Sequence, residues 1–189
     1  MKIEYEATFE NIDKNSIRRR LRKVGAKLVY PEFLQKRDVF SLPSKKKHAW
    51  LRVRKENGRN TMSLKIIDGN KIEDQREICL KVGNYDNAVE FLKMIGCEWK
   101  SYQETKREIW KLEDVEISID EWPFLEPFIE IEGKSEDKVK NICQKLDLDY
   151  KNALFCAIGE LYKRKYELAL DQINNKTPKI TFEMDNPFI

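Results

Sequence analysis

Pairs of like charges separated by one residue recur along the chain and restrict what it can fold into. The clearest segments are Glu4-Tyr5-Glu6, Arg52-Val53-Arg54 and Glu130-Ile131-Glu132. In a β-strand, the two charged side chains of each segment share one face, about 7 Å apart at the backbone. Their repulsion costs little on a solvated face, but inside a barrel it requires an opposite charge or a cation nearby.

Apolar residues that alternate with polar ones predict the strands. They cover residues 2–9, 35–42, 49–55, 61–67, 75–82, 104–112, 115–120 and 127–132, with a short edge strand at 180–182. Helices are expected after Asp13, from Asp86 and after Ser135, and a fourth over roughly 151–170. Because closure leaves no unpaired edge, we expect an α+β fold built on a closed antiparallel eight-stranded β-barrel with flanking helices.

Two parts of the sequence resemble each other. The heptad Lys36–Leu42 follows a predicted helix that ends at Gly25, and the heptad Lys106–Leu112 follows one that ends at Gly96. The heptads match in residue type at each position, which favours a duplicated β-α-β-β unit. Coincidence between two helix–strand units is the alternative.

Length and charge narrow the class of protein. The 189 residues suffice for one domain, which we expect at 1–172, with a C-terminal tail at 173–189. Basic and acidic residues number 36 and 33, so a non-specific nucleic-acid binder is not expected. No apolar run approaches a membrane span, and the N-terminus lacks a signal-peptide core. The four cysteines form no CxxC pair, which predicts a reduced, cytoplasmic protein.

The segregation of acidic and basic pairs onto different strands points to a site for both a divalent cation and a polyanion. Carboxylates are the ligands that Mg²⁺ or Mn²⁺ prefers, and a single arginine can donate two parallel hydrogen bonds to phosphate oxygens. Phosphate recognition must come from side chains, because the chain lacks GxxxxGK[ST] and GxGxxG. For any single segment, the alternative is the outward face of a half-buried sheet.

The ordered set of motifs resembles the CYTH family, the triphosphate tunnel metalloenzymes, over roughly residues 2–165. The segments that carry the resemblance are Glu4-Tyr5-Glu6-Ala7-Thr8, Leu51-Arg52-Val53-Arg54, Ser63-Leu64-Lys65, Lys106-Arg107, Ile119-Asp120 and Phe128-Ile129-Glu130-Ile131-Glu132. That family includes class IV adenylyl cyclases, thiamine triphosphatases and inorganic triphosphatases. Thr8 is a departure, because the family has a triphosphate-binding lysine there.

The resemblance implies roles for residues inside a tunnel. Metal ligands and catalytic acids would be Glu4, Glu6, Glu130 and Glu132, with Asp120 also catalytic and Glu77, Glu116 and Thr8 supporting. Phosphates would be held by Arg52, Arg54, Lys65 and Arg107, and the strand parity leaves Lys106 as the alternative to Arg107.

The implied partner is a small molecule that contains a triphosphate, and the implied cofactor is Mg²⁺ or Mn²⁺. Three activities stay open on the sequence: a triphosphatase, a class IV adenylyl cyclase, and a triphosphate-binding module without turnover. Neither a nucleic acid nor a membrane is expected as a partner. Which triphosphate is bound, which metal is used, and whether the protein is a homodimer are left open.

Overall fold

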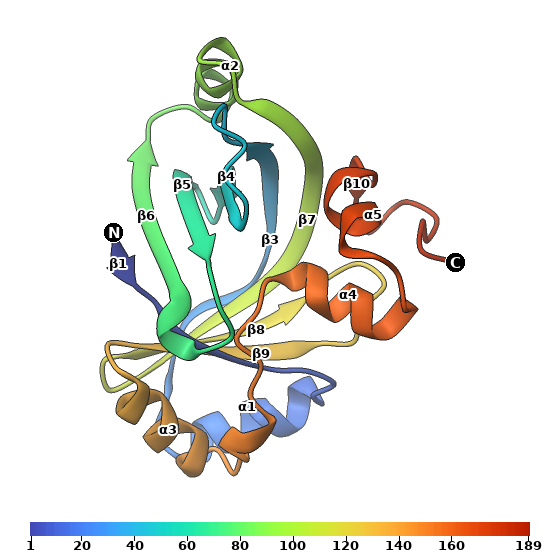
Figure 1. Ribbon diagram of the computed structural model, residues 1–189. Coiled ribbons are helices and arrows are strands. Elements are labelled where there is room, and N and C mark those ends of the chain that lie inside the picture. Colours follow the sequence, from blue (N-terminus) through green and yellow to red (C-terminus); the bar gives the residue numbers. More distant parts are fainter.

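The computed structural model describes residues 1–189 and shows a nearly closed antiparallel barrel flanked by helices (Figure 1). The strands are β1 (Lys2–Ile3), β2 (Tyr5–Phe9), β3 (Lys27–Ser41), β4 (Ala49–Glu56), β5 (Arg59–Ile67), β6 (Gln75–Val82), β7 (Glu98–Leu112), β8 (Val115–Glu121), β9 (Phe128–Gly133) and β10 (Lys179–Ile180). The helices are α1 (Lys14–Lys23), α2 (Tyr85–Met94), α3 (Glu136–Lys145), α4 (Ile158–Tyr166) and α5 (Leu170–Asn175), with single 3₁₀ turns at Ile72–Asp74 and Tyr150–Asn152.

The barrel closes through the N-terminal strand. The strand order is β1-β6-β5-β4-β3-β7-β8-β9-β2, and β1 and β2 are two parts of one strand interrupted at Glu4. At the interruption, Glu4 N–H donates to Gln75 O at 3.0 Å, and Gln75 Nε2 donates to Glu6 O at 2.9 Å. The nine ring strands therefore occupy eight positions, which confirms the predicted barrel.

The pairing of β3 with β7 shows the expected internal repeat. Arg37 lies opposite Gln103, and Arg107 lies opposite Phe33. Gln35 pairs with Thr105 at the centre, so exchanging the two strands maps each pair onto the other. The neighbouring strands repeat this arrangement. In the sheet, β3 is followed by β4 and β5 on one side, and β7 is followed by β8 and β9 on the other. The barrel thus has an approximate two-fold axis between its two halves, as a duplicated unit requires.

The largest apolar core lies outside the barrel wall, between the sheet and the helices. Ile117, Ile119, Ile129 and Ile131 are all fully or almost fully buried on the outer face of β8 and β9. The helices α1 and α3 lie together at this end of the barrel (Figure 1), and α3 contacts both strands. Because successive residues of a strand point to opposite faces, the charged residues between the isoleucines point inward.

Local signals position the helices largely as expected. The side chains of Asp13 and Ser135 accept hydrogen bonds from Ser16 N–H and Lys138 N–H, and so cap α1 and α3. The second helix begins earlier than predicted, since Asn84 is its capping residue and Asp86 lies within its first turn.

The C-terminal region differs from the prediction. The expected helix over 151–170 is two helices, α4 and α5, because residues 153–157 are not helical and Glu167 ends α4 in the left-handed conformation at φ 56°. The short strand β10 lies at Lys179–Ile180 and pairs with β7 in parallel, not as an edge at 180–182. Ile173, Ile180 and Phe188 are buried against Trp122 and Tyr162. The domain boundary at 172 stays a prediction.

The strands β3 and β7 are longer than predicted. Residues 27–34 lack a clean alternation, contain Pro31 and are mostly exposed, so their strand pattern is weak.

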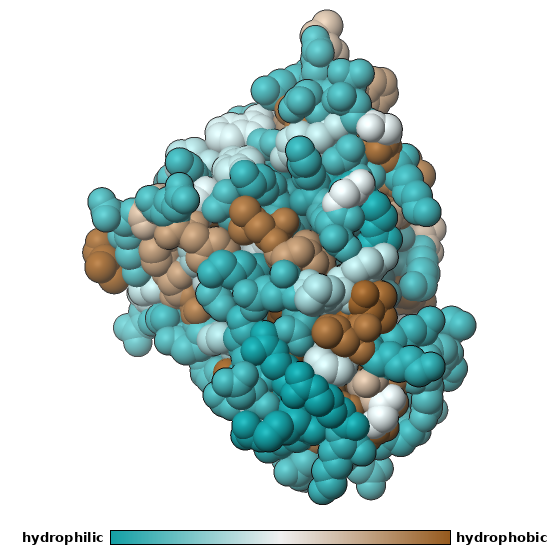
Figure 2. All heavy atoms as spheres, turned by 180° about the vertical axis from the view of Figure 1, so that it is seen from behind, coloured by the Kyte–Doolittle hydropathy of each residue, from teal (hydrophilic) through white to brown (hydrophobic).

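The chain has a mean hydropathy of −0.68, and the face in Figure 2 is mostly hydrophilic with separate apolar areas. No helix is both long enough and apolar enough to cross a membrane.

Candidate functional site

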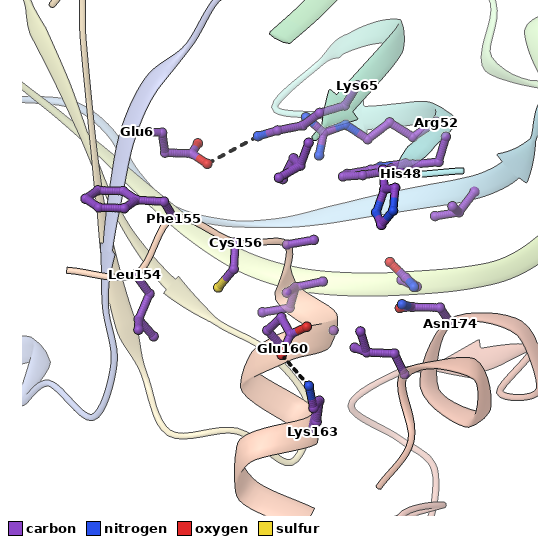
Figure 3. A pocket seen from close by; sticks show the side chains of 18 of the residues that line it. Glu6, His48, Arg52, Lys65, Leu154, Phe155, Cys156, Glu160, Lys163 and Asn174 are labelled. Atoms are coloured by element: carbon purple, nitrogen blue, oxygen red, sulfur yellow. Dashed lines mark hydrogen bonds and ion pairs between the residues drawn. The ribbon is translucent and has the colours of Figure 1, made fainter. Parts of the chain in front are cut away.

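The inner wall of the barrel, the segment before α4, and the helices α4 and α5 line an open cavity of about 1170 Å³. Charged residues of the barrel wall line one part of it: Glu6, Arg37, Arg52, Arg54, Lys65, Arg107 and Glu130. In Figure 3, Glu6 and Lys65 point toward each other, and Phe155, Leu154 and Cys156 lie below Glu6 in this view. The structure therefore brings six of the predicted charged residues, Glu6, Arg52, Arg54, Lys65, Arg107 and Glu130, to one cavity.

Lys65 on β5 is held by two carboxylates of the N-terminal strand. Its Nζ lies 3.2 Å from both Glu4 Oε2 and Glu6 Oε1. Burial opposes the charge of Lys65, but Glu6 and Glu4 outweigh it and raise the pKa of the ammonium. The lysine thus occupies the space between two of the expected metal ligands.

A second group of charges joins β4 to β6. Arg52 Nη2 lies 3.0 Å from Glu77 Oε2, and Arg54 Nη2 lies 3.7 Å from Glu77 Oε1. Burial raises the pKa of Glu77, but Arg52 and Arg54 reverse this and hold it below its usual value. Glu77 therefore stays ionised between two arginines and balances part of their charge.

A third group lies on the opposite wall, where Arg107 on β7 meets β8 and β9. Its Nε lies 2.6 Å from Asp120 Oδ1, and its Nη2 lies 2.7 Å from Glu130 Oε2. Asp120 is fully buried and also accepts a hydrogen bond from Ser118 Oγ at 2.7 Å. Burial raises the pKa of Glu130, and Arg107 opposes the rise.

The acidic side chains fit a divalent cation by their chemistry. Glu4 Oε2 is buried and receives no well-aligned hydrogen bond, although Lys65 Nζ is within 3.2 Å. Burial raises the pKa of Glu4 to about 7; Lys65 opposes this, and Glu77, Glu6 and Glu132 add to it. A cation would relieve this crowding, and carboxylate oxygens are suitable ligands. The acids do not form a ready group of three, since Lys65 and Arg107 lie among them.

Several residues predicted for the site lie at the margin of the cavity or outside it. Glu132 lies opposite both Glu6 and Glu116 in the strand register, and its partner Lys2 is mostly exposed. Lys106 is not an inward residue, because the strand pleat points it outward to Glu121 at 3.5 Å and over the Phe182 ring. The assignment of Lys106 to phosphate binding is therefore corrected.

Thr8, where the family resemblance implies a lysine, lies on the inward-facing side of β2. It is buried and lies opposite Glu130 in the strand register. Its side chain carries no positive charge.

The sequence analysis missed Arg37 on β3. Its side chain lines the cavity, the residue is 5% exposed, and its guanidinium lies 4.5 Å from the centre of the Trp122 ring. Burial, followed by the charges of Arg52, Arg107 and Arg54, lowers its pKa well below the usual value. The internal repeat indicated this residue, because Arg37 has the same position in the first heptad as Arg107 has in the second.

Other residues that line the cavity were also missed. They include the exposed loop residue His48, Trp50 on β4, and the exposed Asn174 of α5. Figure 3 shows His48 above Asn174, with the Glu160–Lys163 ion pair of α4 lower in the view. These residues come from segments far apart in the sequence, so no single motif marks them.

Known proteins share this architecture. The sequence model of the CYTH domain matches residues 2–158. A Methanocaldococcus jannaschii protein named "Putative adenylate cyclase" is 29% identical over 140 residues, or 71% of this chain and 79% of that protein. A conserved hypothetical protein from Pyrococcus furiosus superposes with a TM-score of 0.71 at 22% identity, covering 84% of this chain and 99% of that one. A Vibrio parahaemolyticus protein named "putative adenylate cyclase" superposes with a TM-score of 0.74 at 13% identity, covering 85% of this chain and 97% of that one. At these identities the two structures show the fold alone.

Proposed function

The chain belongs to the CYTH family, and from this premise we propose that it is a metal-dependent phosphohydrolase that cleaves a triphosphate inside the barrel. The observation that carries the proposal is the convergence of Arg37, Arg52, Arg54, Lys65 and Arg107 on one cavity, with carboxylates beside most of them. A triphosphate carries several negative charges, and buried cations bind such an anion far more strongly than exposed ones.

In this proposal, the role of each residue follows from the charge of its side chain. Arg52, Arg54 and Arg107 would bind phosphate oxygens and stabilise the charge that builds up on them as the bond to the leaving group breaks. A positioned water would attack the terminal phosphorus, and the leaving diphosphate would keep the bridging oxygen. The proposed attack uses no histidine base; the one histidine, His48, belongs to the exposed loop before β4.

Glu4, Glu6, Glu130 and Glu132 would hold Mg²⁺ or Mn²⁺. The bound cation would supply further neutralisation of the phosphate oxygens. For these acids to bind it, Lys65 has to leave Glu4 and Glu6, and Arg107 has to leave Glu130. The phosphates of the substrate are the natural new partners of both cations, so metal and substrate would bind together.

A phosphate-release assay tests the proposal. Chelator-treated protein is given Mg²⁺ or Mn²⁺ and a panel of inorganic, nucleoside and thiamine triphosphates. We expect metal-dependent phosphate release from at least one of them, and its loss in Glu6→Gln. Glu126→Gln is the matched control, since Glu126 pairs with Lys165 at 2.8 Å outside the cavity and the variant should keep full activity. No release from any triphosphate would refute the hydrolase.

A cyclase reaction on ATP is the second candidate. The cavity continues past the cations to Trp50, Ile158 and Asn174, which leaves room for an adenosine group. Product analysis separates the reactions, because a cyclase yields cyclic AMP and pyrophosphate, whereas a hydrolase yields inorganic phosphate from the terminal position. Cyclic AMP as the main product would replace the hydrolase with the cyclase.

A binding module without turnover is the third reading, and Thr8 motivates it. A lysine at this buried position would add a cation opposite Glu130. Tight triphosphate binding without turnover, together with turnover in Thr8→Lys, would favour this reading over both enzymes.

A further inference from the structure

Large apolar side chains on the outer face of β5 and β6 are left uncovered. Ile78 and Leu80 of β6 are 43% and 52% exposed, and they lie opposite Leu64 and Met62 of β5. Glu77 points into the barrel, so its neighbour Ile78 points outward, and Leu80 with it. Figure 1 shows α2 above this face and no helix beside β6. These four apolar residues define the β5–β6 face, which is largely open to solvent.

The internal repeat shows what covers the equivalent face in the other half of the barrel. By the approximate two-fold axis, β5 and β6 correspond to β9 and β2. The corresponding cross-strand pairs are Met62–Leu80 with Ile129–Phe9, and Leu64–Ile78 with Ile131–Ala7. The second set is at most 5% exposed, because α3 packs against β9 and β2. Between β5 and β6 the chain forms only a 3₁₀ turn, so the β5–β6 face keeps its apolar residues without the helix that would cover them.

The helix α2 has a second apolar side that contacts nothing. Phe91, Met94 and Ile95 are 56%, 80% and 51% exposed, and their spacing places them on one side of the helix. Ala88 and Leu92, on the other side, are buried against the barrel. The helix is 10 residues long, as is α3. Because its buried side fixes α2 to its own barrel, its exposed apolar side is available only to another molecule.

We propose that two copies of this chain form a two-fold dimer, in which the exposed side of α2 in each copy covers the β5–β6 face of the other. The two surfaces adjoin in one copy, because Met62 and Val82 pack partly against α2. A two-fold rotation therefore brings helix onto strands twice, which closes the assembly at two copies. In each copy, α2 of the other takes the place that α3 has in the second half of the barrel. The inference does not depend on the chemistry of the cavity.

The charges of the two surfaces favour this arrangement over direct contact between two β5–β6 faces. Arg76 is the one charged residue at the outward positions of β5 and β6. On α2, Glu90 lies one turn before Met94, and Asp86 lies one turn before Glu90. Arg76 and both acids are exposed and have no ion-pair partner within 4.0 Å, and the helix has one base, Lys93. Contact between helix and strands brings acids toward Arg76, whereas contact between two β5–β6 faces brings none.

Sedimentation of the wild type and of single variants tests the dimer. The wild type should sediment at twice the chain mass of 22.6 kDa. Leu80→Lys and Phe91→Glu should each lose more than about tenfold in dimer affinity, because each places a charge in an apolar contact. Both residues are about half exposed, so circular dichroism should show that each variant is folded. The control is Leu28→Lys on β3, which is 46% exposed, lies outside both surfaces and should stay dimeric.

A mixture of the two variants tests whether α2 meets the β5–β6 face. In a dimer of one Leu80→Lys chain with one Phe91→Glu chain, one of the two contacts is wild type on both sides, and the other pairs the introduced lysine with the introduced glutamate. The equimolar mixture should therefore form dimers although neither variant does alone. A mixture that stays monomeric would overturn the proposed contact. A wild type that is monomeric up to about 100 μM, or a dimer lost in Leu28→Lys and kept in Leu80→Lys, would overturn the proposed dimer.

Discussion

Replacing Glu4 by glutamine should stabilise the metal-free protein at alkaline pH. The Glu4 side chain is 12% exposed, and its pKa rises from 4.5 to about 7 because it is buried beside Glu77, Glu6 and Glu132. A shift of this size corresponds to about 3 kcal/mol between the two protonation states. Glutamine keeps the shape of the side chain and removes the charge, so it should recover much of this energy.

The direction in which the free energy of unfolding changes with pH follows from proton binding. Between pH 4.5 and about 7, the unfolded chain has released the proton of Glu4 while the folded protein still holds it. The free energy of unfolding therefore falls across this range, and the full loss is present above pH 7. At pH 5, the Glu4→Gln variant should match the wild type within about 1 kcal/mol, and at pH 8 it should be more stable by up to about 3 kcal/mol.

Urea unfolding with a chelator at pH 5, 6, 7 and 8 measures the difference. Glu10→Gln is the control, because the Glu10–Arg164 pair is partly exposed and should change stability by less than about 1 kcal/mol at every pH. Adding Mn²⁺ at pH 8 should stabilise the wild type and not Glu4→Gln. A variant that is less stable than the wild type at pH 8, or a difference independent of pH, would refute the reasoning.

Three further substitutions test separate parts of the structure. Arg54→Ala should weaken triphosphate binding by about 1.5–3 kcal/mol, measured by calorimetry, because it removes a charged donor while Arg52 still holds Glu77. Glu132→Gln should abolish metal-dependent phosphate release without changing the circular dichroism spectrum, and full activity would remove it from the site. Tyr162→Phe should lower the free energy of unfolding by about 1 kcal/mol in urea, because the buried hydroxyl donates to Pro123 O at 2.7 Å. An unchanged midpoint would mean that this bond does not anchor α4.

The sequence predicted the strands that alternate clearly, and with them the inward face of the strands that carry Glu6, Arg52 and Glu130, although it left open whether Lys106 or Arg107 points inward. It did so because a strand with buried isoleucines on its outer face, such as β9, has only one register that hides them. It failed for residues 27–34, whose exposed side chains leave no such pattern.

The sequence analysis could not show which charges meet. The pairing of Lys65 with Glu4 joins strands far apart in the chain, and it depends on how the N-terminal strand closes the barrel. Arg37 shows the same limit, because its sequence neighbours do not reveal that its cross-strand partner is Arg54. Only the heptad repeat carried a hint, through the inward position of Arg107.

The repeat explains why both signs of charge occur in one barrel. In the register, Arg54 stands where Asp120 stands in the other half, and Lys65 stands where Glu132 stands. Two identical halves would place like charges on both walls, and a basic barrel would repel itself while an acidic one would reject phosphate. Divergence to opposite signs lets most of the buried charges neutralise each other in the empty cavity. Under the proposed function, the same divergence would place phosphate-binding cations opposite metal-binding carboxylates, which a metal-bound polyanion needs and a single ion of either sign does not.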